Sequence, residues 1–195
     1  MNRPFVPRRT SGFTLVEMLV VVAIIAILAA ILIPSVGGAR KAAAKRKAEL
    51  ECNAIKVAVE QFFSDFKYMP WGDPDDPKAR VGDDKWTKEA QEHEDVMKLL
   101  RGSNMLHKAY LEISSRDTKA SADDEEEGLF YDPWKNYYRI YMDRNLDQQI
   151  DYTYCSDTKT YKARVLVLSY GPDGIEDNED DIRTFDLLEK ETPSL

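Results

Sequence analysis

The sequence predicts an α+β protein in which a long N-terminal helix packs on a small antiparallel β-sheet. Three observations support this fold class. Residues 18–39 carry no charged side chain, residues 50–69 place apolar side chains every three or four positions, and residues 137–170 contain three runs of β-forming residues. With 195 residues, the chain has room for one globular domain beside an apolar segment.

The apolar segment is long enough to cross a bilayer, because a helix over residues 18–39 rises about 30 Å, the thickness of the hydrocarbon core. A secretory signal peptide would have a shorter apolar core followed by small residues, and residues 31–35 make a poor cleavage site of that kind. A plain membrane anchor would fit the length but leaves Glu17 unexplained. We therefore expect a transmembrane helix over residues 13–39, with either a kink or a simple bend at Pro34.

Glu17 distinguishes this segment from an ordinary anchor. A charged side chain in the middle of a bilayer costs about 2.5–3.5 kcal/mol, and less near the interface, so an acid at the start of a spanning helix indicates a function. Residues 12–17 read Gly-Phe-Thr-Leu-Val-Glu, follow the basic pair Arg8-Arg9 and precede the apolar run. This arrangement resembles the class III signal of type IV pilins and type II secretion pseudopilins.

The resemblance implies how the N-terminus is processed. A prepilin peptidase in the inner membrane would cleave between Gly12 and Phe13 and methylate the new amine of Phe13. The apolar helix would then remain in the product, ready to enter a filament. The chain would accordingly divide into a leader peptide over residues 1–12, a transmembrane and filament-core helix over 13–39, and a periplasmic pilin-like domain over 40–195.

Physical chemistry supplies a role for Glu17 in assembly. In a helical stack of subunits, its carboxylate would meet the positive amine of Phe13 from a neighbour, so that two buried charges neutralise each other and fix the axial register. The alternative is that Glu17 lies at the level of the lipid headgroups and interacts with the positive end of the helix dipole.

The segment after the apolar run predicts that the helix continues into the globular domain. Its apolar side chains recur every four residues and are Leu50, Ala54, Ala58, Phe62 and Phe66. We expect this helix to stop before Pro70. The other predicted elements are helices over 86–100 and 105–113, a polar loop over 114–128, and an antiparallel meander of strands over 137–142, 150–155 and 161–170.

Cys52 and Cys155 are the two cysteines of the chain, and they allow at most one intrachain disulfide. The two alternatives are an oxidised pair, which the export of the domain would permit, and two buried thiols. The sequence has no CxxC motif or mixed cysteine–histidine cluster that would suggest zinc.

Two motifs near the C-terminus carry a second resemblance. Residues 132–138 read DPWKNYY, and residues 169–174 read SYGPDG and precede the acidic run at 179–181. Together they resemble the major pseudopilin of type II secretion. The pattern of that family has glycine where Lys135 stands and proline where Tyr137 stands, so the match is close but not complete.

The resemblance implies that the last loop binds calcium. Hard carboxylate and hydroxyl oxygens suit this ion, and a main-chain carbonyl near Leu168 or Gly171 would complete a shell of about six to eight ligands. The alternative is an acidic surface turn without a metal. The expected side-chain ligands are Ser169, Asp173, Asp180 and Asp181.

A second acidic segment, residues 143–150, places Asp, Asn and Asp at alternate positions, as in the first half of an EF-hand loop. Gln148 stands where that loop needs glycine, and Tyr154 stands where it needs a bidentate glutamate. We therefore interpret this segment as a hairpin turn.

The charge balance and the motifs argue against several function classes. A net charge of −8 and a pI near 4.9 disfavour nucleic acid as a partner. His93 and His107 are the two histidines, we expect both to be exposed, and no nucleophile, phosphate-loop or metal-helix motif indicates an enzyme. A monomeric calcium-binding anchor protein stays open as a third class, and in such a protein Glu17 would be dispensable.

We therefore expect a structural subunit of a type II secretion pseudopilus. It would be held in the bacterial inner membrane by one span, with its C-terminal domain in the periplasm, and would polymerise into a homo-oligomeric filament that drives protein export. The expected partners are a prepilin peptidase, minor pseudopilins, an inner-membrane assembly platform and its ATPase. Residues 70–128, which are longer than in the core family, keep open the alternative of a type IV pilin or minor pilin in a surface filament for adhesion, motility or DNA uptake.

Overall fold

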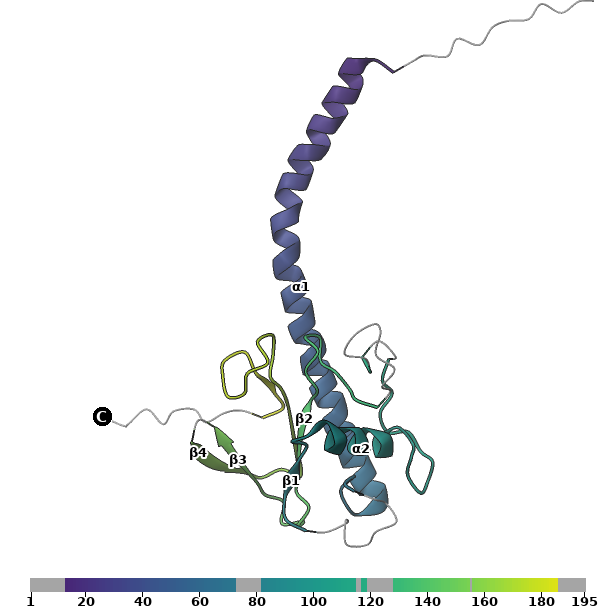
Figure 1. Cartoon of the computed structure of the whole chain (residues 1–195), viewed down its shortest axis with the longest axis vertical. Coiled ribbons are helices and arrows are strands. Elements are labelled where there is room, and N and C mark those ends of the chain that lie inside the picture. The colour runs from purple at the N-terminus through teal and green to yellow at the C-terminus, as the bar shows by residue number, and fades with distance from the viewer. Residues whose placement is uncertain (1–12, 73–81, 115–116, 119–127, 155, 186–195) are drawn as a thin grey trace, which may run out of the picture. The chain divides into compact units, whose positions relative to one another are not determined.

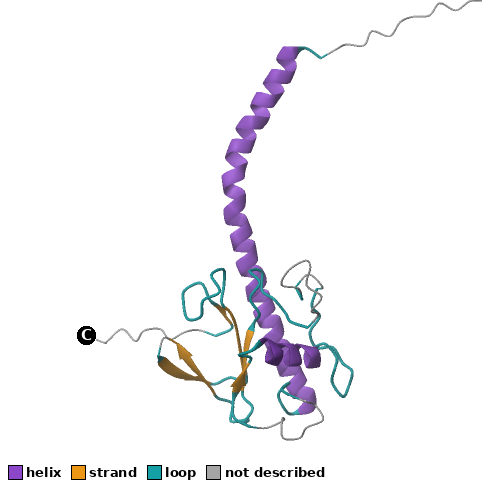
Figure 2. Ribbon diagram, viewed as in Figure 1, coloured by secondary structure: helices purple, strands orange, loops and turns teal. Residues whose placement is uncertain are grey.

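The computed structural model describes residues 13–72, 82–114, 117–118, 128–154 and 156–185, and leaves out the side chains of residues 31–36. These residues form two α-helices and six β-strands (Figures 1 and 2). In chain order the elements are α1 (Leu15–Phe66), β1 (Lys85–Trp86), α2 (Ala90–Leu100), β2 (Arg139–Met142), β3 (Ile150–Tyr154), β4 (Asp157–Tyr161), β5 (Val165–Ser169) and β6 (Ile182–Arg183). The chain separates into two compact units, Met1–Ala43 and Ala44–Leu195, and α1 contributes residues to both.

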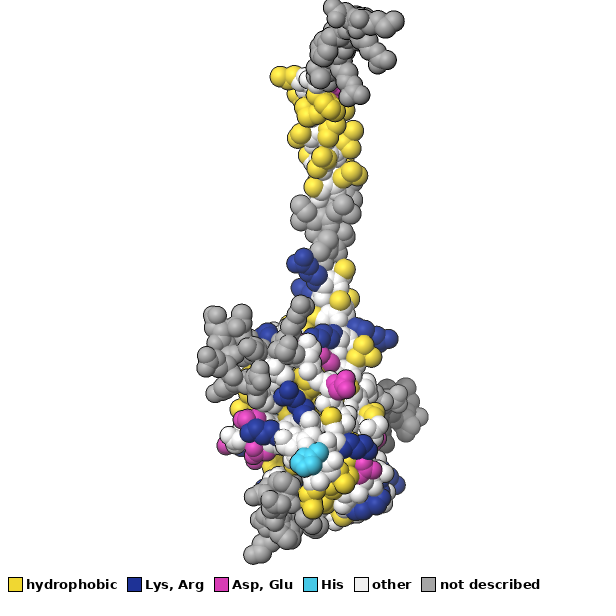
Figure 3. All heavy atoms as spheres, turned by 90° about the vertical axis from the view of Figure 1, so that its right-hand side faces the viewer, with side chains coloured by type: hydrophobic (Ala, Val, Ile, Leu, Met, Phe, Trp, Pro, Cys, Tyr) yellow, Lys and Arg dark blue, Asp and Glu magenta, His cyan; other side chains and the backbone are white. Residues whose placement is uncertain are grey.

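In the first unit, α1 presents its apolar side chains to the outside. Leu15 is 80% exposed, and the large apolar side chains between Val16 and Leu28 are exposed as well (Figure 3). In the part of the chain whose side chains are described, no helix is long and apolar enough to cross a membrane. Residues 31–36 of the predicted span lie outside that part.

In the second unit, the remainder of α1 buries one face. Its most deeply buried side chains are separated by alternating steps of four and three residues, as expected for one face of a helix with 3.6 residues per turn. They are Ala48, Cys52, Ile55, Val59 and Phe62. The predicted four-residue stripe is wrong at Leu50 and Ala54, which are exposed, because each four-residue step advances about 40° beyond a full turn.

α1 ends at Phe66, ahead of Pro70 as predicted. The next residue, Lys67, has a left-handed backbone with φ of 62°, and its N–H donates to the Phe63 carbonyl at 2.8 Å. This bond satisfies one of the carbonyls that the end of a helix leaves unpaired.

α2 begins later than predicted, because Lys85 and Trp86 form strand β1 instead of helix. The Glu92 carboxylate caps the start of α2 by accepting the N–H groups of Lys88 at 2.8 Å and Glu89 at 3.1 Å. The predicted helix over residues 105–113 is wrong.

Asn104 explains why this second helix does not form. Its side-chain amide donates to the carbonyls of Leu99 and Lys108, and its side-chain oxygen accepts the N–H groups of Leu106 and Lys108. An asparagine that bonds to the neighbouring backbone in this way offers it an alternative to the helical pattern.

The main sheet is antiparallel, with strand order β1-β2-β5-β6, and β3 and β4 form a separate hairpin. The predicted meander is therefore wrong, because β2 pairs with β5, with Ile140 opposite Val167, and not with β3. Residues 143–149 join two different sheets, so they are not a hairpin turn. β5 buries all of its side chains and fits the interior of a sheet covered on both faces, whereas β3 alternates between buried and exposed side chains.

Two apolar cores lie on the two faces of the main sheet. The first joins α1 and α2 to side chains of the sheet that include Ile140 and Val167. The second lies under the β3–β4 hairpin and includes Tyr152 and Leu166. Successive side chains of β5 thus enter opposite cores, as the alternation of a strand requires. The predicted α+β class, a long N-terminal helix packed on a small antiparallel sheet, is confirmed.

Candidate functional site

Thr14 and Glu17 form a capping box at the start of α1. The N–H and the hydroxyl of Thr14 each donate to Glu17 Oε2 at 2.8 Å, and the Glu17 N–H donates to Thr14 Oγ1 at 3.2 Å. This reciprocal pairing satisfies N–H groups that a helix start leaves unpaired. Thr14 was not among the predicted functional residues, although a Thr-x-x-Glu spacing before an apolar run signals such a box.

The surface around this capping box is open and apolar. Phe13 is 77% exposed, Glu17 is exposed, and the aliphatic side chains that follow face outward around the helix. A contiguous apolar surface of this kind indicates association with lipid or with other apolar surfaces. Gly12 lies outside the described residues, so cleavage between Gly12 and Phe13 stays a prediction.

Near the C-terminus, the structure brings the two predicted motifs together. The buried Ser169 hydroxyl donates to Asp132 Oδ2 at 2.6 Å. Beside this bond, Asn136 Nδ2 donates to the Gly171 carbonyl at 3.0 Å. Residues 132–138 and 169–174 are therefore joined by hydrogen bonds. Asp132 and Asn136 belong to the predicted motif but were not among the predicted ligands.

The Asp132 carboxylate organises the turn in its own motif. Its Oδ1 accepts the N–H groups of Trp134 and Asn136, both at 2.9 Å, and its own N–H donates to the Asn136 carbonyl at 2.8 Å. Burial raises the pKa of Asp132, while the hydrogen bond from Ser169 and those from the turn oppose that rise. Because an ionised carboxylate accepts these bonds best, the turn and Ser169 stabilise the charged form.

Gly171 allows the two halves of the C-terminal loop to approach. Its backbone has φ of 66°, and a Cβ built there would lie 2.3 Å from the carbonyl oxygen of Asp180. A side chain at this position would meet main chain, which cannot rotate away. Glycine is therefore required both for the conformation and for the space.

The expected calcium ligands all lie in or beside this loop, and the side chains of Ser169, Asp173 and Asp181 bond to other groups. Ser169 donates to Asp132, and Asp173 accepts the Ile175 N–H at 3.0 Å and Asn178 Nδ2 at 2.7 Å. Among the described residues, no group of three or more Asp, Glu, His or Cys side chains is placed to hold a metal ion. Asn178, which was not among the predicted ligands, crosses the loop by donating from its side-chain amide to Asp173 and to the Ile175 carbonyl.

Asp181 is the most deeply buried of the three expected carboxylate ligands. Its Oδ2 accepts the Asp177 N–H at 2.9 Å and pairs with the Arg183 guanidinium, while its Oδ1 is buried without a hydrogen-bond partner. Burial raises the pKa of Asp181, and the positive charge of Arg183 acts against that rise. Asp181 thus offers one unsatisfied oxygen to a cation, although Arg183 already supplies a positive charge.

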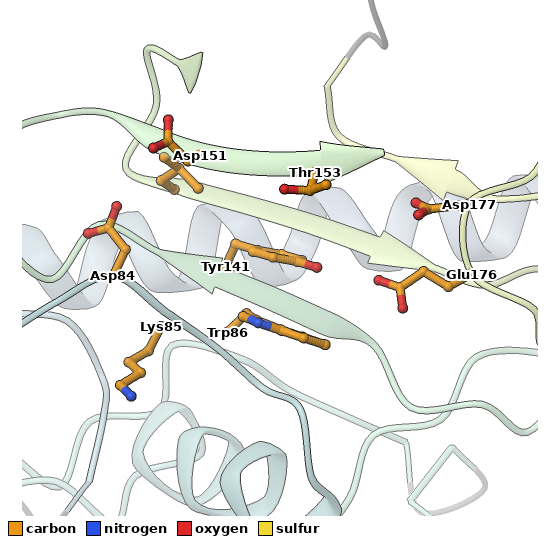
Figure 4. Close-up of a pocket in the computed structure, with 9 residues that line it drawn as sticks. Asp84, Lys85, Trp86, Tyr141, Asp151, Thr153, Glu176 and Asp177 are labelled. Carbon is orange, nitrogen blue, oxygen red and sulfur yellow. The ribbon is translucent and has the colours of Figure 1, made fainter. Parts of the chain in front are cut away.

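A hollow of about 310 Å³ lies where β1 and β2 face β3 (Figure 4). The rings of Trp86 and Tyr141 stack in it with 5.2 Å between centroids and an interplanar angle of 8°. Acidic side chains stand at its two ends and are Asp84, Asp151, Glu176 and Asp177. The lining contains no imidazole or thiol.

The prediction that His93 is exposed is wrong. Its side chain is fully buried on α2, and its Nε2 accepts the Phe130 N–H at 3.1 Å. Burial lowers the pKa of His93 to about 3, so the ring is neutral at physiological pH. His107 is exposed as predicted. The buried imidazole holds the chain at Phe130 and serves the fold.

Cys52 is a free thiol in the first core, with an exposed fraction of 1%. Burial raises its pKa, and its Sγ contacts the Ile182 carbonyl at 3.9 Å. A buried thiol with a raised pKa is inert. Cys155 lies outside the described residues.

Comparison with known proteins addresses the N-terminal segment. The family described as "Prokaryotic N-terminal methylation motif" matches residues 7–33. The chain carries this motif. The match spans Gly12, Phe13 and Glu17, and it confirms the resemblance of the N-terminal segment to the processing signal of type IV pilins and pseudopilins.

Two curated relatives extend the comparison beyond the methylation motif. The type IV wide pilus major component PilA4 of Thermus thermophilus is 64% identical over 36 residues, which cover 18% of this chain and 28% of the relative. The type II secretion system core protein G of Aeromonas hydrophila is 36% identical over 63 residues, which cover 32% of this chain and 44% of the relative. The chain thus spans less than half the length of either relative. No solved structure matches it. The similarity is to structural components and not to enzymes, in agreement with the prediction.

Proposed function

We propose that the protein is a structural subunit of a type II secretion pseudopilus, which polymerises through its N-terminal helix to drive protein export. The observation that carries this proposal is the methylation motif followed by an α1 surface whose apolar side chains are exposed. A subunit with such a surface needs an apolar environment, first a bilayer and then the interior of a filament. The likeness to a type II secretion core protein supports the choice of filament.

Processing comes first in this proposal. A prepilin peptidase cuts between Gly12 and Phe13 and methylates the Phe13 amine, so that residues 1–12 are lost and α1 is kept. Before assembly the subunit crosses the bacterial inner membrane once, and the domain from residue 40 onward lies in the periplasm. Mass spectrometry of the N-terminal peptide from cells tests this step, because methylated Phe13 at the N-terminus is expected and an intact Gly12–Phe13 bond contradicts it.

Glu17 directs assembly by charge in this proposal. In the separate chain its carboxylate is held by Thr14 at the N-terminal end of α1. Once Phe13 becomes the N-terminus, its amine carries a positive charge, and the Glu17 of one subunit pairs with the Phe13 amine of the next. The capping box supports this role, because it keeps the carboxylate at the end of the helix where a neighbouring amine arrives.

The assembly machinery follows from the same likeness. A homo-oligomeric pseudopilus of this subunit is extended by an inner-membrane platform with its ATPase, and minor pseudopilins complete it. Type II secretion depends on the filament, so a clean deletion should remove several proteins from the culture medium while surface filaments stay unchanged. Secretion that continues at the parental level would overturn the proposal.

A second candidate is a type IV pilin or minor pilin in a surface filament. The 64% identity to a wide pilus component over 36 residues favours it. The same deletion separates the candidates, because a pilin deletion removes surface filaments and their adhesion, motility or DNA uptake while secretion continues.

Calcium at the C-terminal loop is part of the proposal. Asp173, Asp180 and Asp181 supply carboxylates, and the unsatisfied Asp181 Oδ1 favours a cation there. The Ser169 hydroxyl and a carbonyl near Leu168 or Gly171 complete the set. Binding requires Arg183 to release Asp181, or to share it. Calorimetry on the chelator-treated full chain tests this site: heat that Asp173→Asn and Asp181→Asn remove supports it, and unchanged heat in both variants contradicts it.

A further inference from the structure

The loop between β2 and β3 contains a buried carboxylate oxygen without a partner. Asp143 is fully buried, and its Oδ2 accepts the Gln148 N–H at 2.8 Å. Its Oδ1 is buried too and has no hydrogen-bond partner. The bond to Gln148 ties the carboxylate to the other end of the same loop. A buried carboxylate oxygen left unpaired is costly, so its retention points to a missing partner.

Other oxygens of the same loop are close to Asp143 in sequence and fixed in orientation. Asn145 Oδ1 accepts the Asp147 N–H at 2.9 Å, and Asp147 Oδ1 accepts the Gln149 N–H at 2.8 Å. Each of these oxygens keeps a second lone pair for another partner. Asp147 is exposed, so the open side of the loop faces solvent.

The backbone of this loop shares one feature with an EF-hand loop, a positive φ at the sixth position. An EF-hand takes ligands from its first, third and fifth residues, which correspond to Asp143, Asn145 and Asp147, and has glycine at the sixth. Gln148 occupies that sixth position with φ of 64°, a conformation that a side chain disfavours. Although the sequence has glutamine where an EF-hand loop needs glycine, Gln148 adopts the positive φ that glycine would supply there.

We propose that the β2–β3 loop binds a calcium ion through the carboxylates of Asp143 and Asp147, the side-chain oxygen of Asn145 and the main-chain carbonyl of Gln149. All of these donors are hard oxygens, which suit calcium. The site is separate from the C-terminal loop and does not depend on the proposed function in secretion.

The number and charge of the oxygen ligands determine the calcium affinity that we expect for this loop. The loop supplies two carboxylates, and calcium affinity in such loops depends on the number of charged ligands. Tyr154 stands where an EF-hand has its bidentate glutamate, so water must fill the remaining positions. Weak binding with a Kd on the order of 10⁻⁴–10⁻³ M is therefore expected, the range of extracellular calcium modules.

Two neighbouring features modulate the site. The Asp84 carboxylate accepts the Arg144 N–H at 3.2 Å, so a further negative charge lies beside the loop. Asp147 and Gln148 also line a cavity of about 520 Å³, and Lys162 and Arg164 line the same cavity. The cavity leaves room for the water shell of the ion, while the two cations weaken binding and make it sensitive to salt.

Calcium bound in this loop would stabilise the connection between the main sheet and the β3–β4 hairpin. The Asp143 N–H donates to the Arg164 carbonyl at 3.0 Å, which continues the β2–β5 ladder, and the loop then leads directly into β3. An ion held by Asp143, Asp147 and Gln149 would fix the β3–β4 hairpin to the main sheet. Calcium should therefore raise the melting temperature of the domain.

The test is calcium titration of the chelator-treated full chain in detergent micelles, followed by calorimetry. Asp147→Asn, at an exposed position that should fold, is expected to weaken the site at least tenfold. Gln148→Gly is expected to tighten it several-fold, because glycine adopts the left-handed turn without strain. Asp157→Asn, an exposed aspartate outside the loop, is the matched control and should change nothing, and Asp173→Asn should leave this site intact.

Two results would overturn the proposal. One is the absence of a calcium-dependent heat in both the parent and Gln148→Gly up to about 10 mM, ten times the weak end of the expected range. The other is heat that Asp173→Asn removes and that neither Asp147→Asn nor Gln148→Gly alters, which would place all calcium binding in the C-terminal loop.

Discussion

The hydroxyl of Ser169 donates a 2.6 Å hydrogen bond to the carboxylate of Asp132, and both side chains are buried. A bond between a hydroxyl and a buried carboxylate contributes more than a neutral pair, and breaking it leaves the other group without a partner. We expect Ser169→Ala and Asp132→Ala each to lower the free energy of unfolding by about 1–3 kcal/mol. Urea denaturation of the full chain in detergent measures this.

The double variant shows whether the two residues act together. Because the two residues share one hydrogen bond, the double variant should lose less free energy of unfolding than the two single variants lose in sum. The difference should be about 1 kcal/mol or more. Thr153→Ala is the control, since it removes an exposed 2.9 Å bond to Thr158 and should cost under about 0.5 kcal/mol. Strictly additive losses at Ser169 and Asp132 would count against the coupling.

Gly171→Ala should destabilise the C-terminal loop more than Gly174→Ala. Both glycines have positive φ, so alanine pays about 1–2 kcal/mol for the left-handed backbone at either site. At Gly171 the new Cβ also lies 2.3 Å from the Asp180 carbonyl, whereas at Gly174 it meets the Asn136 side chain at 3.0 Å. Overpacking against main chain should add about 1–3 kcal/mol at Gly171. Equal melting temperatures for the two variants would contradict this reading.

His93 should make the protein less stable in acid. Its pKa is about 3 in the folded chain, because burial disfavours the charged ring, and about 6.5 when unfolded. The unfolded state therefore binds the extra proton between these values. The stability that His93 contributes is fully present above pH 6.5 and is lost as the pH falls toward 3, with a slope of up to about 1.4 kcal/mol per pH unit.

Comparison with His93→Gln isolates this effect, because glutamine can still accept the Phe130 N–H but does not titrate. The raised pKa values of Asp132 and Asp181 act in the opposite direction in both proteins and cancel in the difference. Urea midpoints between pH 4.5 and 7.5 should converge for the two proteins as the pH falls. Parallel curves would mean that His93 is not buried in its neutral form.

Glu17→Gln separates the two roles of this residue. Glutamine can replace glutamate in a capping box with Thr14 but cannot neutralise the Phe13 amine of a neighbour. If charge pairing directs assembly, Glu17→Gln and Glu17→Ala should both lose filaments. Electron microscopy and the proteins released into the medium report the outcome. Normal assembly in Glu17→Gln, with loss only in Glu17→Ala, would show that helix capping is sufficient.

The fold class was predictable because local patterns carry it. The end of α1 before Pro70 and the β-rich run of β5 follow from composition and periodicity. The pairing of β2 with β5 was not predictable, because nothing in the spacing of the strands indicates that residues 150–161 form their own hairpin. The burial of His93 was not predictable either, because its sequence neighbours on α2 are charged.

The candidate site was predictable only in part. The sequence identified Glu17, Ser169 and the aspartates of the last loop by their resemblance to a family. It could not show that Ser169 bonds to Asp132, because the two are distant in sequence and only the sheet brings them together. Conversely, the rule that an EF-hand loop needs glycine argued against a metal site at residues 143–149. That rule is too strict here, because Gln148 adopts the left-handed conformation without being glycine.

β5 buries every one of its side chains, and this has a consequence for how the sheet finds its alignment. In a strand with one polar face, a shift of one residue exposes apolar side chains and is penalised at once. In β5 the residues on both faces are apolar, so such a shift would exchange one core for the other at little hydrophobic cost. Ser169, at the end of the strand, would then lose Asp132, so this buried polar contact favours the correct alignment of an interior strand.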